Sequence, residues 1–133
     1  MNEKQIQMAK QRLMNKRFQA YADLPKKYAG ISFTPPQGVR DNALRALKKR
    51  AEQPPSKRGM TAVGIARARD LSNGVSVSPE TIKRMVAYFT RHEIDKQGST
   101  WGEYGKGRQA WDGWGGDEGF TWSKKVLAQM DKA

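Results

Sequence analysis

The sequence predicts an all-α protein: a small bundle of four to six short helices with a glycine- and tryptophan-rich loop. Two observations support this fold class. Apolar residues recur at helical spacing in several separate segments, and residues that start or stop helices stand at the ends of those segments. Only residues 31–33 have the character of a short extended piece. A chain of 133 residues can form one domain with a modest core and an attached segment.

The first periodic segment is NEKQIQMAKQRLMNKRFQAYADL, residues 2–24. Its apolar residues keep roughly helical spacing, and its Lys and Arg lie largely off that stripe. We therefore expect a helix that packs by one side and is basic on the other, or one that is ordered only against a partner. Pro25, Gly30 and Pro35 then indicate a connector.

A second helix is expected at residues 36–53. Pro36 suits a first-turn position, where a missing N–H costs nothing. Small apolar residues form a narrow face, and much of the remaining surface is basic, with Arg40, Arg45, Lys48, Lys49 and Arg50. Part of this pattern is ordinary helix chemistry, because cations near a C-terminus complement the helix dipole.

The segment PPSKRG, residues 54–59, breaks this helix and adds Lys57 and Arg58. It is the best candidate for a domain boundary. We therefore expect a basic helical N-terminal arm at residues 1–58 and a compact helical module at residues 59–133.

Two well-marked helices are predicted at residues 61–74 and 78–92. Thr61 and Ser78 are N-cap residues, and Gly74 offers the left-handed conformation that ends a helix. In the later helix, apolar side chains at i, i+3, i+4 and i+7 point to the core, so three cations point elsewhere: Lys83, Arg84 and Arg91. In the earlier helix Arg67 and Arg69 are expected to be exposed, with Asp70 near enough to neutralise them in part.

The segment GSTWGEYGKGRQAWDGWGGDEGFTW, residues 98–122, holds all four tryptophans and eight glycines. Trp111 and Trp114 are one helical turn apart in a short helical segment, residues 106–114, which favours a role as core anchors. Trp101 and Tyr104 lie on a glycine-flanked loop and are the better candidates for stacking on unpaired bases. Two cations follow them and would lie near the phosphates: Lys106 and Arg108. A closing helix is expected from about Asp117.

The formal net charge is +12, and most of the excess lies in residues 1–58, at +10, against +2 for residues 59–133. Such a balance favours polyanionic partners, nucleic acid first. A solvated surface that only aids solubility is the plainer alternative. An anionic lipid surface is a weaker one, because aromatic residues are not interleaved with the basic residues of the first segment.

The chain has no cysteine, which suits a reducing compartment and removes zinc sites built on sulfur. It has no apolar run of about 20 residues and no signal-peptide core at its N-terminus, so we expect no membrane partner.

Catalysis and metal binding have little support in the sequence. His92 is the only histidine, so a second nitrogen or sulfur ligand is missing. Asp112, Asp117 and Glu118 could hold Mg²⁺ in a nuclease, but acidic residues among glycines more often form turns and caps. The stretch GKGR lacks the spacing and ending of a phosphate-binding P-loop. We expect no enzyme activity, no cofactor and no metal.

Two resemblances bear on function. IARARDLSNGVSVSPETIKRMVAYF resembles the second helix, loop and third helix of lac-repressor-type DNA-binding domains, although PSKRGM stands where that family has another helix and a tight turn. By analogy, the helix expected at residues 61–74 would enter a DNA major groove. More broadly, residues 59–123 resemble a short module that recurs in tailed-bacteriophage proteins, some associated with head or DNA functions.

These observations predict a non-catalytic DNA-binding protein of a bacteriophage, in the host cytoplasm or the virion interior. DNA is favoured over RNA, and phosphate contacts would position the protein without reading sequence. The alternative is a virion or head-assembly protein whose basic arm contacts an acidic protein or the packaged genome. The candidate nucleic-acid contacts are Arg45, Lys48, Lys49, Arg50, Lys57, Arg58, Arg67, Lys83, Arg84, Arg91, Trp101, Tyr104, Lys106 and Arg108.

Overall fold

The computed structural model describes residues 2–8 and 24–133, and the helical elements follow the predicted order. Residues 3–8 are helical, and the remainder of the helix predicted at residues 2–24 lies largely outside the described residues. The later helices are α2 (Gln37–Glu52), α3 (Ala62–Ser72), α4 (Pro79–His92), α5 (Lys106–Gly113) and α6 (Gly116–Lys132). Three short 3-10 turns, η1 (Lys26–Tyr28), η2 (Pro55–Lys57) and η3 (Glu93–Gln97), join them. The described residues form no strand, which confirms the all-α fold class.

Local capping explains where α3 and α4 begin. The Thr61 hydroxyl accepts from the Gly64 N–H at 3.0 Å, and the Ser78 hydroxyl accepts from the Thr81 N–H at 3.1 Å. Each bond satisfies one of the backbone donors that a helix N-terminus leaves without a partner. Gly74 has a φ of 69° just after α3, as expected for the residue that ends a helix.

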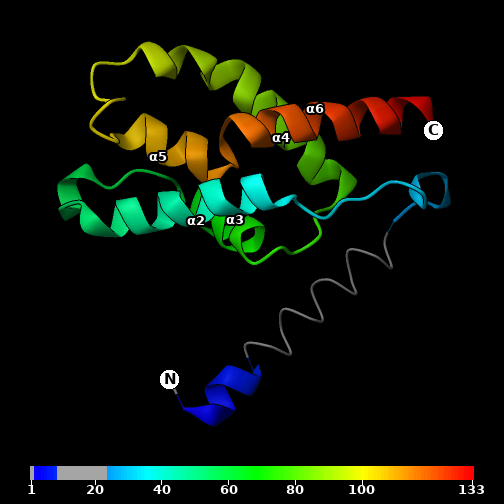
Figure 1. The fold of residues 1–133 in the computed structure, drawn as a ribbon, viewed down its shortest axis with the longest axis horizontal. Coiled ribbons are helices and arrows are strands. Elements are labelled where there is room, and N and C mark those ends of the chain that lie inside the picture. Colours follow the sequence, from blue (N-terminus) through cyan, green and yellow to red (C-terminus); the bar gives the residue numbers. More distant parts are fainter. Residues whose placement is uncertain (1, 9–23) are drawn as a thin grey trace.

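The helices pack around a single core. α2 packs against α3, α5 and α6, while α4 packs against α6. In Figure 1, α2 and α3 lie on one side of α5 and α4 lies on the other, and α6 runs from the end of α5 toward the C-terminus. The connector before α2 joins this arrangement through Phe33, which is buried and whose carbonyl accepts from the Val77 N–H at 3.0 Å.

Aromatic rings from three helices form the centre of the core. Phe89 of α4 lies 4.8 Å from the Trp111 ring of α5 in an edge-on contact, and 5.1 Å from the Phe120 ring of α6 in a stacked one. Trp111 is 1% exposed, and Trp114 is half-buried and stacks on Tyr88 at 5.0 Å. The prediction that these two tryptophans anchor the core is therefore confirmed.

α2 shares this core with the helices that follow it. Val39, Ala43 and Ala46 are all fully buried, and Val39 and Ala43 belong to the same cluster as Trp111 and Phe89. This packing differs from that expected for an arm that ends at residue 58. The boundary predicted at residues 54–59 corresponds to η2, a short turn that brings α3 back alongside α2.

The glycine- and tryptophan-rich segment is mostly helical. Turns occupy residues 98–104, after which α5 begins at Lys106. α6 begins after Gly115, which has a φ of 116°, and Gly116 follows with a φ of 67°. These left-handed positions favour glycine and produce the sharp turn between α5 and α6.

Candidate nucleic-acid interface

Three exposed cations follow the outer face of α2. Arg45, Lys48 and Lys49 line a shallow depression of about 360 Å³, together with the exposed Leu44 and two acidic residues. The Lys49 ammonium is 3.9 Å from the Glu52 carboxylate. Arg45 also borders a second cleft, which is described below. Because Lys48 and Lys49 each follow Arg45 by about one turn of a rigid helix, the three side chains form a short row of positive charge.

Arg50 and Arg58 have structural partners. The Arg50 Nε donates to the Gly59 carbonyl at 2.8 Å, and the Arg58 Nε donates to the Gln53 carbonyl at 2.9 Å. A second nitrogen of Arg58 donates to the Ala51 carbonyl at 3.2 Å. These bonds hold the turn after α2 against the helix, so we rank the two arginines below their neighbours as phosphate contacts.

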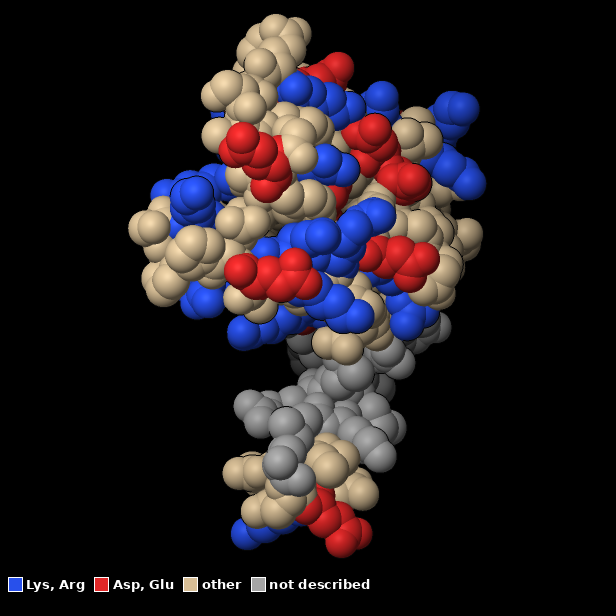
Figure 2. Space-filling model, turned by 60° about the vertical axis from the view of Figure 1, so that its left-hand side comes forward, with Lys and Arg blue, Asp and Glu red and all other residues tan. Residues whose placement is uncertain are grey.

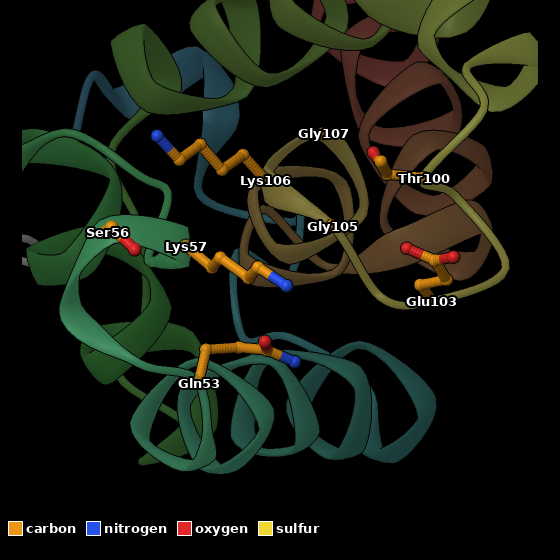
Figure 3. Close-up of a pocket in the computed structure, with 8 residues that line it drawn as sticks. All are labelled: Gln53, Ser56, Lys57, Thr100, Glu103, Gly105, Lys106 and Gly107. Atoms are coloured by element: carbon orange, nitrogen blue, oxygen red, sulfur yellow. The ribbon is translucent and has the colours of Figure 1, made fainter.

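A pocket of about 390 Å³ lies between the end of α2, η2 and the start of α5 (Figure 3). Gln53 and Lys57 extend into the space between α2 and α5, and Thr100 and Glu103 face it from the loop. The Lys106 side chain extends away from the other labelled side chains. The pocket therefore has one ammonium group directed inward, with a carboxylate on its opposite side.

Gln109 positions this end of the molecule, a role that the sequence did not predict. Its side chain is fully buried, and its amide nitrogen donates to the carbonyls of Lys57 and Tyr104 at 3.1 and 3.0 Å. Its amide oxygen accepts from the Gly59 N–H at 2.7 Å. One glutamine thus ties the η2 turn and the loop to α5. The only sequence signal was a polar residue two positions before a buried tryptophan.

The loop prediction is wrong for Tyr104. Tyr104 is 8% exposed, and its hydroxyl donates to the buried Asp112 carboxylate, so its ring is not free to stack on a base. Burial is the main cause that raises the pKa of Tyr104, and the neighbouring Asp112 raises it further. Trp101 is half-buried and packs against the core through an edge-on contact with Trp111 at 6.1 Å.

Arg108 lies between these two aromatic side chains. Its guanidinium carbon is 4.7 Å from the Tyr104 ring centre and 5.9 Å from that of Trp101. Its Nε is 3.8 Å from the Asp112 carboxylate, which belongs to the same helix. Arg108, Arg45 and Lys96 line a polar cleft of about 300 Å³ beside Trp101.

The second predicted patch lies on α3 and α4. Lys83, Arg84 and Arg91 are exposed on α4. Arg67 of α3 is half-buried above the Trp114 ring, 5.8 Å from its centre, and 3.9 Å from Asp70. Burial lowers the pKa of Arg67, and the nearby Arg84 lowers it further. Arg67 is therefore less exposed than the sequence predicted, while the predicted contact with Asp70 is confirmed.

Figure 2 shows the charge on the end of the molecule that is at the left in Figure 1. Lys and Arg side chains gather across the middle of this face, and Asp and Glu side chains lie between them. The face is therefore basic but mixed, and its acidic side chains reduce the attraction of the basic ones for a polyanion.

Several acidic residues that the structure describes have partners other than a metal ion. In the described residues, no group of three or more His, Cys, Asp or Glu is placed to hold a metal ion. His92 Nδ1 is 3.0 Å from the Asp95 carboxylate, and its ring stacks on Tyr88 at 4.7 Å. Asp112 and Asp117 each contact a cation, so their carboxylates have protein partners.

The fold and the interface define a small basic all-α protein with cations on several helices. Searches of protein-family models, curated proteins and solved structures each returned no match. Within residues 2–8 and 24–133, no helix is long and apolar enough to cross a membrane.

Proposed function

We propose that the protein binds the phosphate backbone of DNA with little sequence specificity and without catalysis, as a bacteriophage protein. The observation that supports this most is the row of exposed cations on α2, with the exposed Lys57 in the turn that follows the helix. Contacts of this kind neutralise phosphates and fix orientation, but they carry no information about base sequence.

The geometry supports this proposal because the row is held rigidly. α2 buries its opposite face in the core, so Lys48 and its neighbours start from a fixed backbone. A fixed backbone loses less conformational freedom on binding than a mobile segment does. Each phosphate that a cation neutralises steepens the salt dependence of duplex binding by about 0.9 in a log–log plot.

The test is a salt titration of duplex DNA with the Lys48→Ala/Lys57→Ala double variant. We expect weaker binding on every DNA sequence and a salt slope flatter by up to about two units. The matched control is Lys125→Ala/Lys132→Ala, which removes the same charge from exposed positions on α6. Equal effects from the two double variants would show that net charge alone, and no α2 site, controls binding.

Single-stranded DNA, RNA and heparin complete the experiment. We expect DNA to bind more tightly than heparin at matched charge, because phosphate spacing matters as well as charge. If heparin competes as well as duplex DNA and both double variants bind alike, the rival function is favoured. That rival is a virion or head-assembly protein whose basic arm contacts an acidic protein or the packaged genome.

A further inference from the structure

A polar cleft of about 300 Å³ lies between α2, α5, the start of α6 and the loop after η3. It is lined by three cations and three carboxylates: Arg45, Lys96, Arg108, Asp112, Asp117 and Glu118. Its volume is at the lower end of the range for small-molecule sites, which suits a ligand about the size of one nucleotide.

The cations and carboxylates of the cleft are already coupled. Lys96 Nζ is 2.7 Å from the Asp117 carboxylate, and Arg108 Nε is 3.8 Å from that of Asp112. The Arg45 guanidinium donates to the Asn42 side-chain oxygen. With three positive and three negative side chains, the cleft carries no net charge. A bare anion such as phosphate therefore meets as much repulsion as attraction, and a ligand with both hydrogen-bond donors and an anionic group fits better.

Trp101 supplies an aromatic wall to this polar cleft. The ring is half-buried, and its edge-on contact with Trp111 and its neighbour Arg108 hold it in place. A held indole face beside charged groups is the arrangement on which nucleic-acid bases stack, and stacking contributes about 1–3 kcal/mol per base.

Arg45 connects the cleft to the outer face of α2. The same side chain borders both the cleft and the depression lined by Lys48 and Lys49. A strand whose phosphates followed α2 would therefore pass the mouth of the cleft at Arg45.

We propose that this cleft binds one unpaired nucleotide whose base carries an exocyclic amine. The base stacks on Trp101, its amine donates to a carboxylate of the cleft, and its phosphate lies toward Arg45. Carboxylates accept from the N4 amine of cytosine and can accept from the N2 amine of guanine, whereas the N3–H donor of thymine is flanked by two carbonyl oxygens that carboxylates repel. The inference rests on the proposed function, since it assigns a base site to the same DNA-binding surface.

The direct test titrates the full chain with mononucleotides and follows tryptophan fluorescence and the indole N–H signals in ¹H–¹⁵N NMR spectra. The probes are dCMP, dGMP, dTMP and deoxyribose 5-phosphate. We expect saturable changes with dCMP and dGMP, binding about tenfold weaker with dTMP, and no saturation with deoxyribose 5-phosphate. Equal responses to dCMP and deoxyribose 5-phosphate would overturn the proposal, as would no saturable response to any base.

Variants separate this site from the backbone interface. Trp101→Leu should weaken dCMP binding about tenfold, whereas Trp101→Phe should retain most of it, because a phenyl ring still stacks. Trp122→Leu is the matched control, since Trp122 is also half-buried but lies on α6 and does not line the cleft. Duplex affinity and its salt slope should be the same for all three variants and the natural chain.

Glu118→Gln keeps the test decisive if Trp101→Leu does not fold. Glu118 is exposed and lines the cleft, and a glutamine oxygen at this position can still accept the hydrogen bond that the Asn42 amide donates to Glu118. We expect this variant to reduce the preference for dCMP over dTMP. A natural chain that binds dCMP but not duplex DNA would contradict the proposed function alone. Unchanged dCMP binding in Trp101→Leu, together with an unchanged preference for dCMP over dTMP in Glu118→Gln, would contradict the cleft alone.

Discussion

Asp112 shows how one buried side chain connects the core to the candidate site. It accepts a hydrogen bond from Tyr104 and lies close to Arg108 and Arg45. Burial is the largest influence and raises the pKa of Asp112, while the Tyr104 hydroxyl and the two arginines oppose the rise. The neighbouring Asp117 differs, because its hydrogen bond with Lys96 lowers its pKa.

The raised pKa of Asp112 has a definite sign for stability. The folded chain binds the Asp112 proton more tightly than the unfolded chain does, so this group reduces stability as pH rises from its ordinary value of 3.8 through its raised value. Asp112→Asn removes the titration but keeps an oxygen that accepts from Tyr104. We expect the variant to gain stability relative to the natural chain as pH rises through that window. Urea unfolding of both proteins between about pH 3.5 and 7 measures the difference, and a difference independent of pH would refute it.

At the scale of helices, the sequence predicted the features that depend on neighbouring residues, but not those that depend on residues distant in the chain. The starts of α3 and α4 depend on Thr61 and Ser78, which bond to N–H groups within the same turn. The break between α5 and α6 instead depends on Asn42 of α2, whose amide donates to the Gly115 carbonyl at 2.9 Å. A Cβ on Gly116 would lie 2.5 Å from the Asn42 nitrogen, so a residue with a side chain at position 116 would clash with the asparagine that holds the turn.

The same difference between local and long-range contacts decided which residues of the candidate site could be predicted. The sequence shows that Arg50 and Arg58 are cations and that Tyr104 is aromatic. Only the fold shows that the two arginines donate to backbone carbonyls and that the Tyr104 hydroxyl donates to a buried carboxylate. Exposed cations on a helix with one apolar face, such as Lys48 and Lys83, were predictable because periodicity alone directs them away from the core.

The cations of α4 allow a prediction at this scale. Ile82, Met85 and Phe89 are fully buried, so Arg84 and Arg91 are held on the outer face of a fixed helix. If they contact phosphates, the Arg84→Ala/Arg91→Ala double variant weakens binding on every DNA sequence and flattens the salt slope by up to about two units. The melting temperature should hardly change, because such surface substitutions cost within about 0.5 kcal/mol. A salt slope equal to that of the natural chain would place the DNA along α2 alone.

At the scale of the whole molecule, the charge distribution and the packing divide the chain differently. Residues 1–58 carry +10 and residues 59–133 carry +2, which suggested an arm and a module. The core extends across that division, because α2 packs against α3, α5 and α6. α2 is therefore both the most basic helix after residue 24 and a structural part of the bundle.

Two fragments test which division governs folding. Fragment 25–133 keeps α2 and all helices after it, and we expect it to melt cooperatively near the temperature of the full chain. Fragment 59–133 loses the fully buried Val39, Ala43 and Ala46, together with the Asn42 bond to Gly115 and the Arg50 bond to Gly59. It therefore exposes the apolar faces of α3 and α5 that α2 covers, and burial of such surface contributes about 25 cal/mol per Å². We expect a broad, low-temperature transition by circular dichroism. A sharp transition at the temperature of fragment 25–133 would instead support an independent module that begins at residue 59, with α2 as part of the arm.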